Sequence, residues 1–333
     1  MRSWFATDAN CLDYLEWIRW PDGFVCPMCE SNDGWRLGDG RHKCVGCGHR
    51  VSVTARTIFD RTRTPLTVWF AACWLFASQK DGVSAQSLQR TLGISSYQTA
   101  WSMLHRLRSC LVRPGRELLE GRIEVDETLI GGTAEGERGG RGAAGKSLVA
   151  IAIELRDPKG FGKCRMARIP DATTESLRDF LAGNVEPGST VVTDGWQAYK
   201  KATSGVFTHE RFVAPYKQGP VLLPAVHRVA SLTKRWLLGT HQGSIDEGHL
   251  PLYLDEFVFR FNRRTSKSRG LVFYRLMQLA VGHDPVRYRD LILQPTPGSK
   301  KSHPPGSRGR PQSLERNGVG KPWRAPADQD WSA

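Results

Sequence analysis

Two aspartates stand at or near the ends of apolar, β-branched segments of the chain. Asp126 lies in the run Gly-Arg-Ile-Glu-Val-Asp that starts at residue 121, and Asp194 closes the run Ser-Thr-Val-Val-Thr-Asp that starts at residue 189. Carboxylates at the ends of two strands of one sheet can share a divalent cation, which is the arrangement that metal-assisted phosphoryl transfer uses. The alternative is that each aspartate only caps a turn.

The segment around Asp126 alternates between polar and apolar residues. In a strand, this alternation places Glu124, Asp126 and Thr128 on one face and the intervening apolar residues on the other. Glu127 breaks the alternation, so we expect it either to end the strand or to support the metal-binding acids from behind.

Four of the eight cysteines form two Cys-x-x-Cys pairs separated by fourteen residues, 30–43. The pairs are Cys26 with Cys29 and Cys44 with Cys47. Two such pairs, joined by a hairpin through Trp35–Lys43, provide the four thiolates of a structural zinc site. Iron in a rubredoxin-like site and a redox dithiol are the alternatives. We expect His42 and His49 to lie on the surface, because four thiolates already complete the site.

The chain of 333 residues carries 47 Lys+Arg against 33 Asp+Glu, a formal net charge of +14. This excess favours a polyanionic partner, nucleic acid first and an anionic membrane surface second. The strongest apolar run, residues 66–77, is shorter than the roughly 20 residues of a membrane-spanning helix, so we expect a buried helix and no membrane partner. With no signal-peptide pattern at the N-terminus, the expected location is the cytoplasm, in association with the nucleoid.

Composition and periodicity divide the chain into four predicted regions. We expect an N-terminal helix and zinc ribbon over 1–60, a helix-turn-helix region over 61–115, an α/β catalytic domain over 120–283 and a disordered basic tail over 294–333. In the catalytic domain the predicted strands are 123–130, 148–155, 164–169 and 190–193, and the predicted helices are 174–181, 225–238 and 250–262.

Residues 84–108 have the pattern of two short helices joined at Gly93, with a serine at position 95 or 96 as the second N-cap. This pattern is typical of a helix-turn-helix, in which the second helix enters a DNA groove. The predicted base-facing side chains are Tyr97, Gln98 and Ser102, and those near phosphates are His105, Arg106 and Arg108. The alternative is a helical hairpin that serves only as a spacer.

Residues 140–147 match the P-loop pattern, but that motif requires a strand before it and a helix after it. The segment that follows, residues 148–155, is apolar and β-rich, and a glycine-rich loop precedes. We therefore favour a mobile basic hairpin over a nucleotide site. Its basic residues Arg138, Arg141 and Lys146 would lie along a DNA backbone.

Taken together, these motifs closely resemble those of the DDE-type insertion-sequence transposases of the ISXO-like group, over roughly residues 5–282. Beyond the zinc ribbon, the paired helices and the Asp194 segment, the resemblance rests on the segments that begin Leu12-Asp-Tyr-Leu-Glu-Trp, Ile123-Glu-Val-Asp-Glu-Thr, Trp236-Leu-Leu-Gly-Thr-His, Tyr253-Leu-Asp-Glu-Phe and Arg269-Gly-Leu-Val-Phe-Tyr. The resemblance implies a ribonuclease-H-like fold in which Asp126 and Asp194 are the first and second acids that bind two Mg2+ ions. It also implies a homo-oligomer that acts on terminal inverted repeats and on target DNA, both double-stranded.

The sequence departs from the family where a third ligand, Glu or Asn, is expected, because Leu232 stands there. On a helical wheel, His227, Ser231 and Lys234 share the face opposite the apolar stripe. We therefore predict His227 as third ligand or acid–base group and Lys234 as a phosphate contact. The alternative is a merely exposed histidine. Since imidazole binds Mg2+ poorly, Mn2+ is the alternative cofactor.

A further predicted contact lies in the helix 250–262 and just beyond it, where Arg260, Arg263 and Arg264 are expected to clamp DNA phosphates while Glu256 plays a structural or supporting part. The predicted function is that of a transposase that cleaves and transfers DNA strands. The alternative is a catalytically silent DNA-binding remnant or regulator, because Leu232 cannot bind a metal ion.

Overall fold

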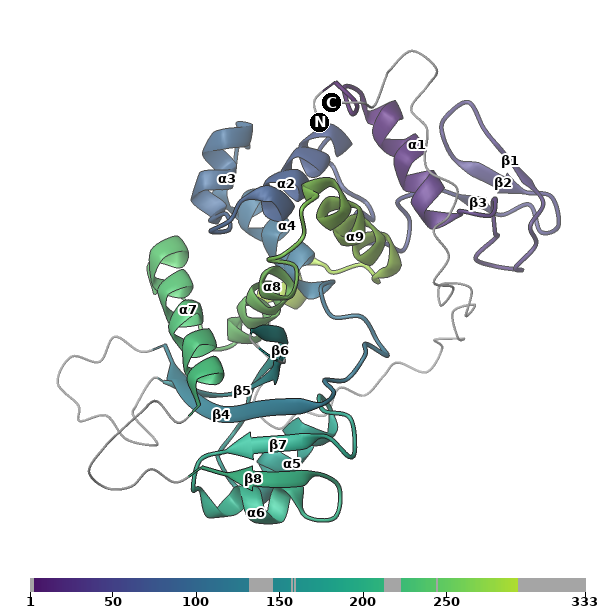
Figure 1. The fold of residues 1–333 in the computed structure, drawn as a ribbon. Helices are drawn as coiled ribbons and strands as arrows, with labels where there is room; N and C mark the ends of the chain where they lie inside the picture. The colour runs from purple at the N-terminus through teal and green to yellow at the C-terminus, as the bar shows by residue number, and fades with distance from the viewer. Residues whose placement is uncertain are drawn as a thin grey trace. The chain divides into compact units, whose positions relative to one another are not determined.

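A computed structural model describes residues 3–131, 146–156, 158, 160–212, 223–243 and 245–292 (Figure 1). The chain divides into two compact units, Met1–Leu75 with Phe273–Ala333, and Phe76–Val272. The predicted tail, 294–333, lies outside the described residues. The four predicted domain boundaries stay predictions.

The first unit begins with helix α1 (Asp8–Arg19), where Thr7 and Asn10 form a capping box. A small antiparallel sheet follows, made of β1 (Gly34–Arg36), β2 (His42–Cys44) and β3 (Arg50–Val51). Trp35 pairs with Lys43, which confirms the predicted hairpin. Aromatic residues form part of the core of this unit, which includes Phe5, Tyr14, Phe70 and Phe273.

The prediction that His42 lies on the surface is wrong. Its side chain is buried, stacks on Phe24 and places Nε2 3.2 Å from an Oε2 atom of Glu16 in α1. Strand alternation explains the placement, because β2 turns His42 and Cys44 to the same, inner side. His49 is half-buried.

Helices α2 (Leu66–Ser78) and α9 (Arg269–Gly282) each begin in one unit and end in the other, and α10 (Tyr288–Ile292) follows in the first unit. Trp69, Phe70 and Phe76 of α2 are fully buried, which agrees with the predicted buried helix. None of the described helices is both long and apolar enough to span a membrane.

The second unit is built on a five-stranded mixed sheet in the order β6-β5-β4-β7-β8. Its strands are β4 (Arg122–Ile130), β5 (Ser147–Leu155), β6 (Phe161–Arg168), β7 (Thr190–Thr193) and β8 (Thr208–Arg211). Strands β4, β5 and β6 pair antiparallel, whereas β7 and β8 run parallel to β4. The predicted α/β class is confirmed, and β8 is a strand that sequence reasoning missed.

Helices cover both faces of this sheet (Figure 1). On one face α7 (Pro224–His241) and α8 (Leu250–Asn262) pack on Ile151, Ile153 and Val192. On the other, α5 (Thr174–Ala182) and α6 (Gln197–Thr203) pack on Ile123 and Val125. The sheet therefore has two apolar cores, because both of its faces are buried under helices.

The helices α3 (Ala85–Leu92) and α4 (Tyr97–Ser109) are joined at Gly93, which adopts a left-handed conformation with φ of 64°. Ser84 caps α3 by accepting a hydrogen bond from the Ser87 N–H. The predicted pair of helices is therefore present, and its assignment as a DNA-binding helix-turn-helix stays a prediction. Helix α4 packs on α8 within the same unit, through a buried ion pair between Arg108 and Glu256.

Candidate active site and metal centre

The two aspartates come from neighbouring parallel strands. In the β4–β7 ladder Glu124 pairs with Val192, so continuing that register by two residues brings Asp126 level with Asp194. An Oδ1 atom of Asp126 accepts a hydrogen bond from the Glu127 N–H at 2.8 Å, and Asp194 accepts one from the Trp196 N–H at 2.9 Å. A backbone amide therefore orients each carboxylate, just beyond the last residue pair of the β4–β7 ladder.

The electrostatics of the pair fit a cation. Burial raises the pKa of Asp126, and the nearby charge of Asp194 raises it further, while the Glu127 amide and His227 act in the opposite direction. Two carboxylates that share a partly desolvated site repel each other, and a divalent ion between them would remove this cost. The donor set is thus suited to Mg2+ or Mn2+.

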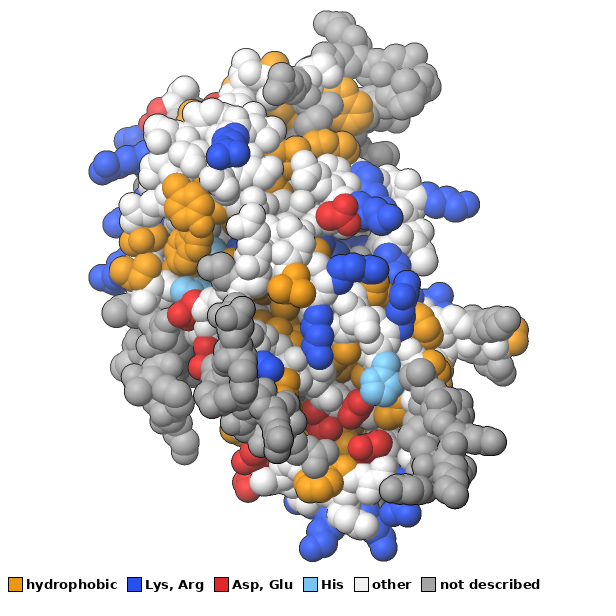
Figure 2. Space-filling view, turned by 90° about the vertical axis from the view of Figure 1, so that its left-hand side faces the viewer, with side chains coloured by type: hydrophobic (Ala, Val, Ile, Leu, Met, Phe, Trp, Pro, Cys, Tyr) orange, Lys and Arg blue, Asp and Glu red, His pale blue; other side chains and the backbone are white. Residues whose placement is uncertain are grey.

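Helix α7 adds a histidine to this pair. The Nε2 atom of His227 lies 4.0 Å from an Oδ2 atom of Asp126, and 51% of the His227 side chain is exposed against 19% for Asp126. The face seen in Figure 2 carries acidic side chains beside a histidine, with Lys and Arg side chains above them. The structure thus brings together three residues that the sequence placed in one site.

Leu232 and Lys234, the other α7 residues considered from the sequence, lie in different environments. Leu232 is half-buried and packs against the core between the sheet, α7 and α8, so the expected third carboxylate is replaced by an apolar contact. Lys234 is exposed, two helical turns after His227. Its side chain is therefore accessible to a phosphate that approaches the acids along α7.

Glu124 belongs to this site, and the sequence did not predict its contact with α7. Alternation correctly places it on the face of Asp126, but its carboxylate accepts hydrogen bonds from the Ala225 and Val226 N–H groups of α7, at 2.8 and 3.0 Å. Those partners are about a hundred residues away in sequence. Alternation alone gave no signal of them.

Glu127 does not end its strand, because β4 continues to Ile130. It lies on the α5–α6 face, where it interacts with Tyr199, a tyrosine whose side chain is fully buried. Burial and the acids Glu127, Asp126 and Asp194 together raise the pKa of Tyr199. Glu127 thus lies on the opposite face of the sheet from Asp126, and its supporting role stays a prediction.

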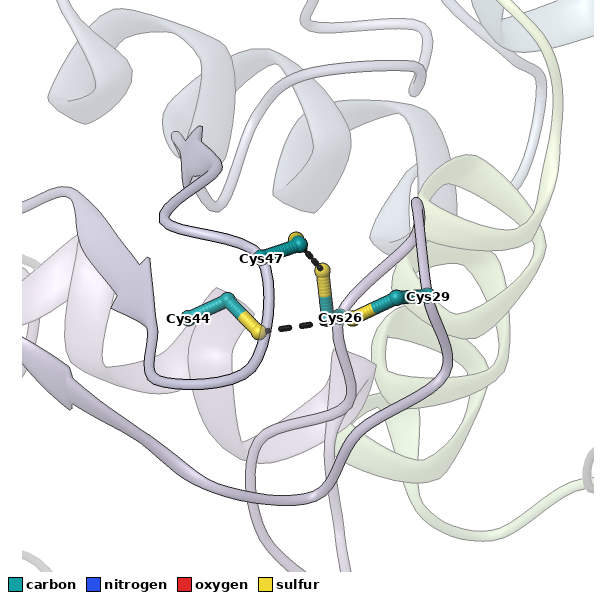
Figure 3. Close-up of side chains that lie close together, drawn as sticks. All are labelled: Cys26, Cys29, Cys44 and Cys47. Carbon is teal, nitrogen blue, oxygen red and sulfur yellow. Dashed lines mark hydrogen bonds between the residues drawn. The ribbon is translucent and has the colours of Figure 1, made fainter.

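The four cysteine sulfurs of the ribbon lie within 4.8 Å of one another (Figure 3). Cys26 Sγ is 3.6 Å from Cys47 Sγ, and Cys29 Sγ is 3.5 Å from Cys44 Sγ. Sulfurs about 2.3 Å from a tetrahedral zinc ion are about 3.8 Å apart, so these distances fit zinc closely.

Each cysteine pair forms the same backbone turn. The N–H of Glu30 donates to the Cys26 carbonyl, and the N–H of Gly48 donates to the Cys44 carbonyl. Both Glu30 and Gly48 are left-handed, with φ of 60° and 69°. This conformation is easy for the glycine and costly for the glutamate.

Comparison with known families agrees with this geometry. Residues 118–262, which contain the aspartate pair and His227, match the family described as the ISXO2-like transposase domain. Residues 6–50, which contain the four cysteines, match the transposase zinc-ribbon domain. The chain therefore contains an ISXO2-like transposase domain and, before it, a transposase zinc ribbon. The predicted family is therefore confirmed, and the ribbon match together with the cysteine cluster supports structural zinc.

One solved structure with a similar chain is described as the cryo-EM structure of a simian T-cell lymphotropic virus intasome in complex with the PP2A regulatory subunit B56 gamma. It is 17% identical, covers 68% of this chain and 85% of that chain, and has a TM-score of 0.28. No curated protein matches the chain.

The α4 residues that were predicted to contact DNA bases differ in how far they are buried. Gln98 is exposed, and so is Tyr97 beside it. Ser102 is buried, which corrects the prediction that it faces a groove, since α4 turns that side toward the unit's interior. Arg106 is half-buried, and burial lowers the pKa of its guanidinium.

The predicted phosphate contacts at His105 and Arg108 are also wrong. Both side chains are only 1% exposed. The Arg108 guanidinium binds Glu256 and lies over the Tyr253 ring, 4.0 Å from its centroid, and His105 stacks on Trp101. Helix α4 thus uses these side chains to pack on α8.

The arginines of the predicted clamp at the end of α8 have hydrogen-bond partners within the protein. Arg260 binds Glu256 at 2.7 Å and donates to the Gln79 carbonyl at 2.8 Å. Arg263 donates to the Phe259 carbonyl, and Arg264 donates to the Gly162 carbonyl and to Phe261. These guanidinium groups donate to backbone carbonyls around the end of α8, but Arg264 is exposed, and the clamp stays a prediction.

The P-loop-like segment lies largely outside the described residues, including Arg138 and Arg141. Lys146 is half-buried and stands directly before β5. A strand follows the pattern where a phosphate-binding loop requires a helix, which agrees with the preference against a nucleotide site.

Proposed function

We propose that this chain is an active DNA transposase that binds the terminal inverted repeats of its element and cuts and joins DNA strands with the help of divalent metal ions. The observation that carries the proposal is the convergence of Asp126, Asp194 and His227 just beyond the segment in which β4 and β7 pair. Family membership supports the same conclusion independently.

In the proposed mechanism, Asp126 and Asp194 hold two Mg2+ or Mn2+ ions. Ions held there would supply the activation of water or of a DNA 3′-hydroxyl and the stabilisation of the leaving oxygen that metal-assisted phosphoryl transfer needs. His227 approaches Asp126 at 4.0 Å and completes the ligand set or accepts the proton of the attacking group. Lys234, exposed further along α7, binds a phosphate of the strand.

DNA is held by other parts of the chain in this proposal. The net charge of +14 supports binding to a polyanion. The zinc ribbon and the exposed start of α4, with Gln98, contact the terminal repeats, and the basic segment with Arg138, Arg141 and Lys146 follows the backbone. The protein acts as a homo-oligomer on double-stranded DNA, associated with the nucleoid.

The proposed architecture of the catalytic domain is ribonuclease-H-like. Support comes from the sheet, in which three antiparallel strands are extended by two parallel ones in the order β6-β5-β4-β7-β8. The first acid lies on β4 and the second follows β7, at the centre of that sheet. The predicted boundary of this domain, 120–283, stays part of the proposal.

The test is cleavage of a labelled duplex that carries the element's terminal repeat. Purified protein with Mg2+ or Mn2+ should nick the duplex, and Asp126→Ala should abolish nicking while DNA binding persists. Lys163→Ala, on β6 away from the acids, is the matched control and should nick normally. Equal nicking by Asp126→Ala and the unmodified chain would refute the proposal.

A second candidate function is a DNA-binding remnant or regulator without catalysis. It is favoured by Leu232, which occupies the position of the expected acid with an apolar, half-buried side chain. Activity that appears only in Leu232→Glu or Leu232→Asn would establish the remnant. Activity in the unmodified chain that is lost in His227→Ala would establish the alternative ligand set.

A further inference from the structure

The N-terminus of α7 is capped from another element. A helix leaves its first N–H groups without partners in the helix, and a side chain just before the first turn usually accepts them. Here the N-cap residue is Leu223, whose side chain cannot accept a hydrogen bond, and the first helical residue is Pro224, which has no N–H. The next two amides, of Ala225 and Val226, are the donors that need an acceptor.

A single carboxylate from the sheet supplies that acceptor. The Oε2 atom of Glu124 accepts both hydrogen bonds, at 2.8 and 3.0 Å, and the side chain is only 4% exposed. The following amide, of His227, donates to the Leu223 carbonyl at 3.1 Å. The first-turn amides of α7 are thus all satisfied, and a negative charge lies at the positive end of the helix.

The position of Glu124 links this cap to the acids. It is two residues before Asp126 on the same strand and face, a separation of about 7 Å along β4. The residue directly after the two capped amides is His227, which meets Asp126 at 4.0 Å. Strand β4 therefore contacts the first turn of α7 at two points, one through Glu124 and one through Asp126.

We propose that Glu124 is a positioning residue, which anchors the first turn of α7 to β4 and so sets the distance between His227 and Asp126. This inference rests on the proposed function for its catalytic consequence, but the anchoring itself is independent of catalysis. With its Oε2 atom committed to two amides, Glu124 acts through His227 rather than on the metal ions or the DNA.

Two variants separate the parts of this role. Glu124→Ala removes the acceptor, whereas Glu124→Gln keeps an oxygen at the same reach and removes the charge. The matched control is Glu154→Ala, because the Glu154 carboxylate accepts a backbone hydrogen bond from Lys163 at 2.7 Å, on β5 and β6 rather than at α7.

The first measurement is amide hydrogen exchange in the full chain without DNA or divalent cations. In Glu124→Ala the amides of Ala225 and Val226 should exchange about tenfold faster or more, since each loses a charge-assisted bond. Glu124→Gln should give a smaller increase, and Glu154→Ala should leave these amides unchanged while exposing that of Lys163. Unchanged exchange at both α7 amides in Glu124→Ala overturns the proposal.

The second measurement is steady-state cleavage of the terminal-repeat duplex with Mn2+. Misplacement of His227 in Glu124→Ala should lower kcat about tenfold to a hundredfold with KM for DNA unchanged, and Glu124→Gln should recover most of the loss. An equal fall in kcat for Glu154→Ala overturns the proposal. Cleavage by no variant, including the unmodified chain, overturns the proposed function alone, because the exchange measurement still decides the anchoring.

Discussion

The buried Glu256 offers a sharp test of how α4 is attached to α8. Its carboxylate is fully buried and lies between two guanidinium groups, with Oε2 2.7 Å from Arg108 and Oε1 2.7 Å from Arg260. Glu256→Gln keeps the shape and removes the charge. It leaves the Arg108 side chain, only 1% exposed, without its counter-charge.

The expected loss of stability is large because the pair is withdrawn from water. Breaking a buried ion pair by removing one partner costs about 3–5 kcal/mol. For a unit of this size, about 2–4 °C of Tm is lost per kcal/mol, so the transition should fall by roughly 6–20 °C. Since a buried pair is poorly screened, 1 M NaCl should not close the gap between the two proteins.

The same pair predicts a pH dependence. Burial raises the pKa of Glu256, but the charges of Arg108 and Arg260 outweigh burial and lower the pKa below its usual 4.5. A carboxyl group with a lowered folded-state pKa stabilises the fold above its unfolded pKa and loses this contribution as the pH falls. The difference between Glu256→Gln and the unmodified chain should therefore persist from pH 5 to 8 and shrink below about pH 4.

Urea unfolding, followed by far-UV circular dichroism at several pH values, measures this difference. Glu117→Gln is the control, because that carboxylate is 68% exposed in its ion pairs and should change stability by no more than about 1 kcal/mol. A loss below about 1 kcal/mol for Glu256→Gln would show that the buried pair does not hold α4 on α8.

Three further predictions concern the metal centre, the histidines and the DNA contacts. Metal analysis should find about one zinc ion per chain, and chelation should unfold the ribbon, as judged by proteolysis near Cys29; an intact ribbon without zinc would contradict the assignment. Burial lowers the pKa of His105 to about 3 and that of His241 to about 4, so the unfolded chain binds more protons than the folded chain below about pH 6.5. Urea unfolding should therefore show that stability decreases as the pH is lowered, by up to about 1.4 kcal/mol per pH unit per histidine. A flat profile between pH 6.5 and 5 would contradict this burial. Lys234→Ala should lower the slope of log K against log salt for DNA binding by about 0.9. Arg264→Ala should leave the slope unchanged, because that guanidinium already donates to backbone carbonyls, and the reverse pattern would support the arginine clamp.

Local patterns were enough to predict the main elements of the transposase domain. The predicted strand 190–193 and helix 250–262 coincide with β7 and α8, because an unbroken β-branched run and an apolar stripe of helical period each decide the element from neighbouring residues. Helix α6 and strand β8 were missed, since α6 is seven residues long and β8 is four and carries no apolar alternation.

The sequence by itself determined the residues whose chemistry is local: the cysteine pairs, whose ligation follows from their spacing, and the two aspartates that end apolar runs. The tertiary structure alone decided which charged side chains remain available. Arg108 and Glu256 are 148 residues apart, and Glu124 is about a hundred residues from the amides that donate hydrogen bonds to it. A charge is committed or accessible according to the partners that folding brings to it, and no pattern within one segment contains those partners.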